Sequence, residues 1–223
     1  MAPYKVSYNV DIVFVIDSTG SMGHTVDMVK NNALSFHGQL MESMAKKQKK
    51  VDKLRVKIVS FRDYLADRDP MLVTDFFDLP EETEDLRTVT NSITADGGGD
   101  EPEDALEALA YAIRSDWDTS CMKSRHIIVL YTDASSHPLG FGRDASLYPS
   151  NMAKDMSELT SWWDNPDYIK QSSKRLLLFA PDTPDWNYIS DNWENVIHYP
   201  SQAGEGLSEM EFNEILSVIA NSI

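Results

Sequence analysis

The stretch DIVFVIDSTGSMGHTVDMV, residues 11–29, indicates the fold class of the chain. It begins with Ile12 to Ile16, a short run of apolar and largely β-branched residues that is typical of a strand buried on both faces. The run ends in Asp17, and a turn of small, hydroxylated residues follows at once. Apolar residues then recur at helical spacing from about Thr25 to Lys46. A buried strand that leads into a helix through a tight turn is typical of an α/β fold.

The rest of the chain repeats this alternation of strand and helix. Further strands are expected at residues 54–61, 71–77, 126–133, 175–181 and 195–200, and further helices at 80–93, at 102–113, around Trp162 and at 207–223. A short polar link centred on Asp67 predicts that 54–61 and 71–77 pair in antiparallel fashion. We therefore expect a single α/β domain over residues 1–223. It would be a Rossmann-like open sheet of six strands, mostly parallel with one antiparallel edge strand, with helices on both faces and a loop embellishment at 134–151.

The charge of the chain limits its partners. The 223 residues carry a formal net charge of −16, which argues against nucleic acid and against anionic membranes, because both require clustered Lys and Arg. The only dense basic run, KKQKK at 46–50, is interpreted as a solvated helix end and turn. Bound cations and basic protein surfaces remain compatible with this charge.

Three weaker features of the sequence indicate the cellular compartment of the protein. The single cysteine, Cys121, excludes an internal disulfide and fits a reducing environment. The first residues lack the apolar core of a signal peptide, and no apolar run reaches the length of a membrane helix. We expect a cytoplasmic protein.

Acidic side chains follow the expected strands at one edge of the sheet. Asp17 and Asp133 each end a buried strand, and Asp100 lies in the glycine-rich loop GGGDE before a helix that should start at the same edge. Ligands bind at the carboxyl ends of strands in open α/β sheets, so these carboxylates and the hydroxyls of Thr19 and Ser21 should converge. Hard oxygen ligands suit Mg²⁺, Mn²⁺ or Ca²⁺.

At these residues the chain resembles the von Willebrand factor A family, which includes integrin I domains. The metal-ion-dependent adhesion site of that family reads D-x-S/T-x-S on its first loop, matched here by Asp17, Thr19 and Ser21. The Thr or Asp of its second loop is matched by Asp100, and the Asp after a hydrophobic strand by Asp133. The resemblance implies a divalent cation, Mg²⁺ first, with an open coordination position. Thr19 and Ser21 would be direct ligands, and Asp17 and Asp133 would act mostly through water and hydrogen bonds.

One departure from the adhesive members concerns charge. Many of them carry an uncharged Thr where this chain has Asp100. Three carboxylates around a dication should hold the metal more tightly and make it a poorer electrophile for an acidic partner. We therefore expect the metal mainly to link the loops, with a partner that is not a simple exposed acid.

Several residues near these motifs have simpler explanations. The turn 18–21 has the composition of a helix N-cap. Glu101 and Glu103 are interpreted as first-turn helix acids that are favourable for the dipole, and His137 as a surface loop residue. Asp11 and Asp96 are interpreted as boundary residues of a strand and a turn. The tryptophans Trp162, Trp163, Trp186 and Trp193 are expected in the core.

Enzyme motifs are less well matched. A haloacid-dehalogenase phosphatase needs a second aspartate where Thr19 stands, and DSTG carries one residue too many for an aspartic protease. The sequence has no G-x-S-x-G elbow and no P-loop. We expect a metal-dependent protein-binding module and not an enzyme, with a metal-dependent hydrolase or phosphotransfer enzyme as the alternative. The resemblance to small standalone bacterial members implies an AAA-type ATPase or a kinase–phosphatase system as partner.

Overall fold

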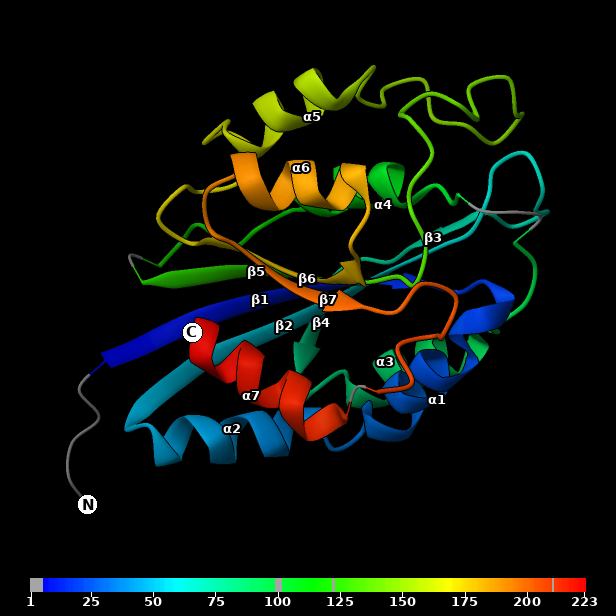
Figure 1. Ribbon diagram of the computed structural model, residues 1–223. Helices are drawn as coiled ribbons and strands as arrows, with labels where there is room; N and C mark the ends of the chain where they lie inside the picture. Colours follow the sequence, from blue (N-terminus) through cyan, green and yellow to red (C-terminus); the bar gives the residue numbers. More distant parts are fainter. Residues whose placement is uncertain (1–5, 99–101, 122, 210) are drawn as a thin grey trace.

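A seven-stranded sheet lies between two layers of helices in the computed structural model, which describes residues 6–98, 102–121, 123–209 and 211–223 (Figure 1). The strands are β1 (Val6–Asp17), β2 (Lys49–Phe61), β3 (Met71–Val73), β4 (Phe77–Leu79), β5 (Ser124–Tyr131), β6 (Lys174–Pro181) and β7 (Val196–Ser201). The helices are the 3-10 turn η1 (Gly20–Met22), α1 (Gly23–Asn32), α2 (Phe36–Lys46), α3 (Thr83–Ser92), α4 (Ala105–Ile113), α5 (Met156–Trp163), α6 (Pro184–Asn192) and α7 (Phe212–Ser222).

The strand order β3-β2-β1-β5-β6-β7 confirms the expected open α/β sheet. Strands β2, β1, β5, β6 and β7 run parallel, and β1 has the central position between β2 and β5. Since parallel strands need crossover helices, both faces of this sheet are covered. Figure 1 shows α4, α5 and α6 on one face and α1, α2, α3 and α7 on the other.

The antiparallel edge consists of two short strands instead of the single one expected at 71–77. Strand β3 pairs with the end of β2, and β4 pairs with its middle. Between them the Thr74 hydroxyl accepts a hydrogen bond from the Ile58 N–H at 3.0 Å, in place of a backbone carbonyl. This side-chain substitution interrupts the ladder and accounts for a seventh strand.

The helix expected from Thr25 to Lys46 is also divided, into α1 and α2. The Asn32 side chain donates to the Met28 carbonyl at 2.8 Å, and a turn at 33–35 follows. Asn competes with helix continuation through such local bonds. The break positions Phe36 against Phe14 of β1, with ring centroids 5.5 Å apart.

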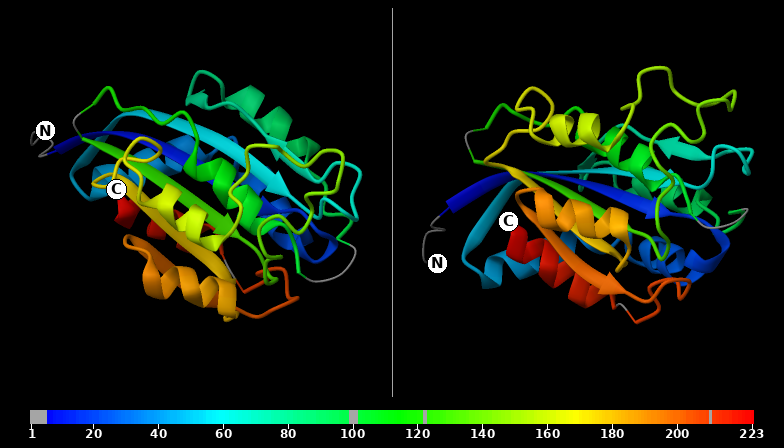
Figure 2. Two further views of the ribbon diagram at one scale, coloured as in Figure 1. Left: turned by 90° about the horizontal axis from the view of Figure 1, so that it is seen from above. Right: turned by 45° about the horizontal axis from the view of Figure 1, so that its top comes forward.

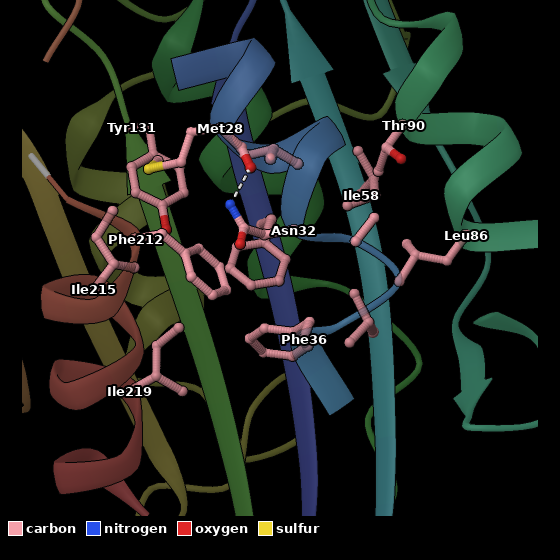
Figure 3. A pocket seen from close by; sticks show the side chains of 14 residues that line it. Met28, Asn32, Phe36, Ile58, Leu86, Thr90, Tyr131, Phe212, Ile215 and Ile219 are labelled. Carbon is pink, nitrogen blue, oxygen red and sulfur yellow. Dashed lines mark hydrogen bonds between the residues drawn. The ribbon is translucent and has the colours of Figure 1, made fainter. Parts of the chain in front are cut away.

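Figure 2 shows helices on both sides of the sheet. Two apolar cores fill the spaces between the sheet and these helix layers. The core under α4, α5 and α6 contains all four of the tryptophans expected there, which are at most 9% exposed. The core under α1, α2, α3 and α7 borders a partly open cavity of about 30 Å³ (Figure 3). The side chains around this cavity are almost all apolar and include Phe14, Phe36, Tyr131 and Ile219, so a water molecule there would find few polar partners.

Asp11 is not the strand boundary that the sequence indicated. Strand β1 begins at Val6, and Asp11 lies inside it with 2% of its surface exposed. Arg55 on β2 makes two hydrogen bonds to its carboxylate, at 2.8 and 2.7 Å. The Asp118 N–H donates a third at 2.6 Å. A buried carboxylate needs such partners, and these allow β1 to extend beyond its apolar run.

Candidate functional site

The first part of the candidate site lies where β1 and β5 end side by side. Ile16 pairs with Tyr131 in the parallel register, so Asp17 and Thr132 follow at the same edge. The Thr132 hydroxyl donates to Asp17 Oδ2 at 2.7 Å. Both residues are fully buried. Thr132 was not recognised from the sequence, although its place before Asp133 in the motif YTD was a usable signal.

The DSTGS turn connects these two strand ends through its hydroxyls. Thr19 donates to Asp17 Oδ1 twice, from its N–H at 2.9 Å and from its hydroxyl at 2.7 Å. The Ser21 hydroxyl donates to Asp133 Oδ1 at 3.0 Å. Thr19 occupies the N-cap position of η1 without a side-chain capping bond, so the helix-cap interpretation of this turn is wrong.

This bonding pattern suits a hard cation. Each hydroxyl uses its proton on a carboxylate, so the lone pairs of Thr19 Oγ1 and Ser21 Oγ are left available to a metal. Among the described residues, no group of three or more His, Cys, Asp or Glu side chains could hold a metal ion by itself. The donor set offered here combines two carboxylates with two hydroxyls, from Asp17, Thr19, Ser21 and Asp133. Such oxygen donors fit Mg²⁺, Mn²⁺ or Ca²⁺.

The fifth expected ligand, Asp100, lies outside the described residues, and the loop that leads to it is joined to the DSTGS turn. The Gly20 N–H donates to the Gly97 carbonyl at 3.2 Å, and the Asp96 N–H donates to the Ser18 carbonyl at 3.1 Å. Gly98 has a φ of +75°, and a Cβ there would come within 3.0 Å of the Thr19 side chain. Two loops distant in sequence thus meet at the candidate site.

Burial changes the acidity of the carboxyl groups here. Desolvation raises the pKa of Asp17 to about 6, against the opposing effect of its hydrogen bonds. Glu103, just before α4, is 4% exposed, and burial followed by the charges of Asp17 and Asp63 raises its pKa to about 9. Glu103 Oε2 is buried without a hydrogen-bond partner. Glu103 is therefore a buried acid beside the site and not the simple first-turn helix acid expected.

Two further buried side chains, Glu107 and His137, connect the 134–151 loop to the elements around the site. Glu107 on α4 accepts hydrogen bonds at 2.9 Å from the Gly140 N–H and from the Tyr148 hydroxyl. Burial raises its pKa to about 7. His137 is 6% exposed, lies 3.3 Å from Asp63 Oδ2 and stacks on Phe141, so the expectation of a surface histidine is wrong.

The β7–α7 loop is a further segment of the candidate site, and the sequence did not predict it. The Gly206 N–H donates to Asp133 Oδ2 at 2.8 Å, and the Gly204 N–H donates to the Asp133 carbonyl at the same distance. The Gly206 carbonyl accepts from the Thr25 hydroxyl at 2.9 Å. Gly206 has a φ of +60°, and a Cβ there would lie 2.2 Å from the Ser21 carbonyl oxygen. The only sequence signal was the motif GEG at 204–206.

An open parallel sheet whose central strands end in this hydroxyl–carboxylate cluster defines a known class of domain. The sequence pattern of the von Willebrand factor A domain matches residues 11–140, more than half of the chain. The chain belongs to the von Willebrand factor A domain family. No curated protein sequence matches it.

Solved structures agree on the fold. A von Willebrand factor type A protein from Catenulispora acidiphila has 16% identity and a TM-score of 0.52, covering 95% of this chain and 42% of that one. The pilus adhesin SpaC from Lactobacillus rhamnosus GG has 12% identity and a TM-score of 0.55, covering 96% of this chain and 30% of that one. SpaC in an open conformation gives 14% identity and a TM-score of 0.53, with the same coverage. This chain thus spans less than half the length of these proteins.

Substituting Gly206→Ala should disrupt the site. The added Cβ meets the Ser21 carbonyl oxygen and the backbone is left-handed, so we expect a loss of roughly 1–3 kcal/mol of unfolding free energy. The matched control is Gly38→Ala in α2, where a Cβ meets nothing within 4 Å and should stabilise the protein by about 0.5–1 kcal/mol. Urea unfolding of both variants measures the difference. Equal effects would contradict the described packing of Gly206.

The buried Glu107 should make stability depend on pH. The pKa of Glu107 is near 4.5 in the unfolded chain and about 7 in the fold. Its contribution to the free energy of unfolding is therefore complete below pH 4.5 and is lost as pH rises through 7. Between pH 5 and 8 the wild type should lose roughly 3 kcal/mol of unfolding free energy through Glu107, and Glu107→Gln should not show this loss. Urea unfolding at both pH values tests this, with the exposed Glu42→Gln as control. A variant with the wild-type slope would contradict the pKa of Glu107.

Proposed function

We propose that the chain is a metal-dependent protein-binding module with a divalent cation, most favourably Mg²⁺, at a site of the adhesion type. The observation that carries this proposal is the pair of hydroxyl-to-carboxylate bonds, Thr19 to Asp17 and Ser21 to Asp133, at adjacent strand ends. These bonds orient two neutral oxygens while their lone pairs remain available. The family membership supports protein interaction as the general role.

The roles of the residues follow from their contacts. Thr19 and Ser21 would be direct ligands through their hydroxyls. Asp17 and Asp133 would orient those hydroxyls and hold metal-bound water, and Asp100 would contribute from the neighbouring loop. When bound, the cation supplies a Lewis-acidic position for an oxygen of a protein partner.

The charge around the site bears on the kind of partner. Glu103 adds a fourth carboxyl group beside the expected three, and burial keeps it protonated near neutral pH without metal. Such a site would release protons when it binds a cation. The bound cation would remain a weak electrophile for an exposed acidic side chain of a partner. We therefore propose that the metal mainly links the loops and that the partner surface is neutral or basic. An AAA-type ATPase or a kinase–phosphatase system as partner, and a cytoplasmic location, remain predictions.

A metal-dependent hydrolase or phosphotransfer enzyme is the competing function. The observation in its favour is the buried Glu103, which would lose its proton when a cation binds and could then accept a proton from metal-activated water. Phosphatase and esterase screening with Mg²⁺ and Mn²⁺ separates the two. Activity that disappears in Glu103→Gln, with metal binding retained, would replace the binding proposal.

Mg²⁺ and Mn²⁺ should raise the thermal stability of the protein. A ligand that binds only the folded state stabilises by about 2.7 kcal/mol at 100 times its Kd, which corresponds to roughly 5–10 °C for a chain of this size. Ser21→Ala should abolish most of the shift. The control Ser92→Ala removes a hydroxyl that only contacts the Val89 carbonyl on α3 and should leave the shift unchanged. A melting temperature insensitive to both Mg²⁺ and EDTA would refute the metal site.

Capture of a protein partner should depend on the same cation. With the wild-type chain as bait, a partner should be retained in Mg²⁺ and lost in EDTA, and Ser21→Ala should lose it in both. Ser92→Ala is again the matched control. A partner retained equally in EDTA would refute metal-dependent binding. Complete loss of binding on changing one exposed partner Asp or Glu would show that an acid completes the metal shell, against the expectation of a neutral or basic surface.

A further inference from the structure

Three cationic side chains gather at the opposite end of the sheet, where the strands begin. They are Lys49 at the start of β2, Arg125 on β5 and Arg175 on β6. Ile127 pairs with Arg175 in the parallel register, so Arg125 and Arg175 lie two positions apart on the same sheet face. Figure 1 shows that α7 ends on this side, where β1 and β2 begin.

A pocket of about 310 Å³ brings these cations together. The rest of its lining comes from Tyr8, Ile197, Tyr199, Val218 and residues 221–223. The Tyr8 ring lies against the Arg125 guanidinium, whose carbon is 4.9 Å from the ring centroid. This cation–π contact holds the side chain in place. A volume of this size is in the range of small-molecule sites.

The three cations lack anionic partners among the described residues. No ion pair joins Lys49, Arg125 or Arg175 to a described carboxylate. Arg125 donates to the Ser124 carbonyl at 3.1 Å, and Arg175 donates to Asn195 Oδ1 at 3.2 Å. Arg125 Nε is buried and has no acceptor. The side-chain hydrogen bonds of Arg125 and Arg175 to described residues go to neutral oxygens only, so no described carboxylate compensates the charges of their guanidinium groups.

The cations also repel one another. Burial and then the Arg125 charge lower the pKa of Arg175, and burial followed by the charges of Arg125 and Lys47 lowers that of Lys49. This repulsion occurs in a chain whose formal net charge is −16, so the cluster runs against the overall composition. An anion in the pocket would relieve it.

We propose that this pocket binds a phosphate dianion, either free or carried by a small molecule. Two guanidinium groups can each present paired N–H donors to phosphate oxygens, and Lys49 adds a third charge. Ile197, which is 45% exposed, and Val218 line the same pocket and offer apolar surface to the body of an organic phosphate. A phosphate is favoured over an acidic protein segment because the cations converge in one pocket and do not form an extended strip. This proposal is independent of the metal site.

The test is calorimetric titration of the whole chain with inorganic phosphate and with phenyl phosphate. EDTA is present throughout, so that no divalent cation can hold the phosphate elsewhere. Binding should weaken about tenfold or more in Arg125→Gln and in Arg175→Gln, through lost charge-assisted bonds. The control Arg143→Gln makes the same charge change on the exposed 134–151 loop and should bind like the wild type. Lys49→Gln is the variant to use if either arginine variant fails to fold.

The outcomes separate the sources of the phosphate. Tighter binding of phenyl phosphate than of inorganic phosphate supports an organic phosphate, and equal binding supports free phosphate. Absence of binding by both, or equal binding in Lys49→Gln, Arg125→Gln and the wild type, overturns the proposal. Binding of a polyglutamate peptide without binding of either phosphate also overturns it and assigns the cluster to an acidic protein segment.

Discussion

The buried carboxyl group of Asp17 is the constraint on which the candidate site depends. It ends the central strand, where water is excluded, and it accepts hydrogen bonds from the Thr19 N–H, the Thr19 hydroxyl and the Thr132 hydroxyl. These bonds set the conformation of the DSTGS turn and fix its distance from β5. Because Ser21 then reaches Asp133, one carboxylate determines how two strand ends and a turn are arranged. The pKa of about 6 shows that the arrangement does not fully compensate the loss of water, a deficit that a cation would remove.

The elements that could be predicted from the sequence are those with local causes. The apolar runs at 12–16 and 127–131 are buried strands because their composition leaves no polar face. The aspartates after them lie at the same edge because parallel strands end there. Features with distant causes could not be predicted. Asp11 can be buried in a strand because Arg55, 44 residues away, and the Asp118 N–H satisfy its carboxylate. Gly206 belongs to the site only because its loop crosses the Ser21 carbonyl, and nothing local indicates that crossing.

The environment of the site could be anticipated only in part. Glu103 and His137 have neighbours in sequence that suggest solvent exposure, and both are buried by loops from elsewhere in the chain. The acidic groups this burial collects lie at one end of the sheet, and the uncompensated cations of Lys49, Arg125 and Arg175 lie at the other. The two ends of the sheet thus differ in chemistry, with buried carboxyl groups at one end and a cluster of cations at the other.

The two margins of the sheet bear on self-association. An exposed, regular edge strand is a template on which another chain can add, and long flat edges promote aggregation. On one margin, β3 and β4 are three residues each, and the Thr74 side chain occupies the position of a ladder bond between them. On the other, β7 carries Pro200, which has no N–H to offer. Neither margin presents an uninterrupted row of donors and acceptors, so the same irregularities that end the sheet also protect it against strand-by-strand polymerisation.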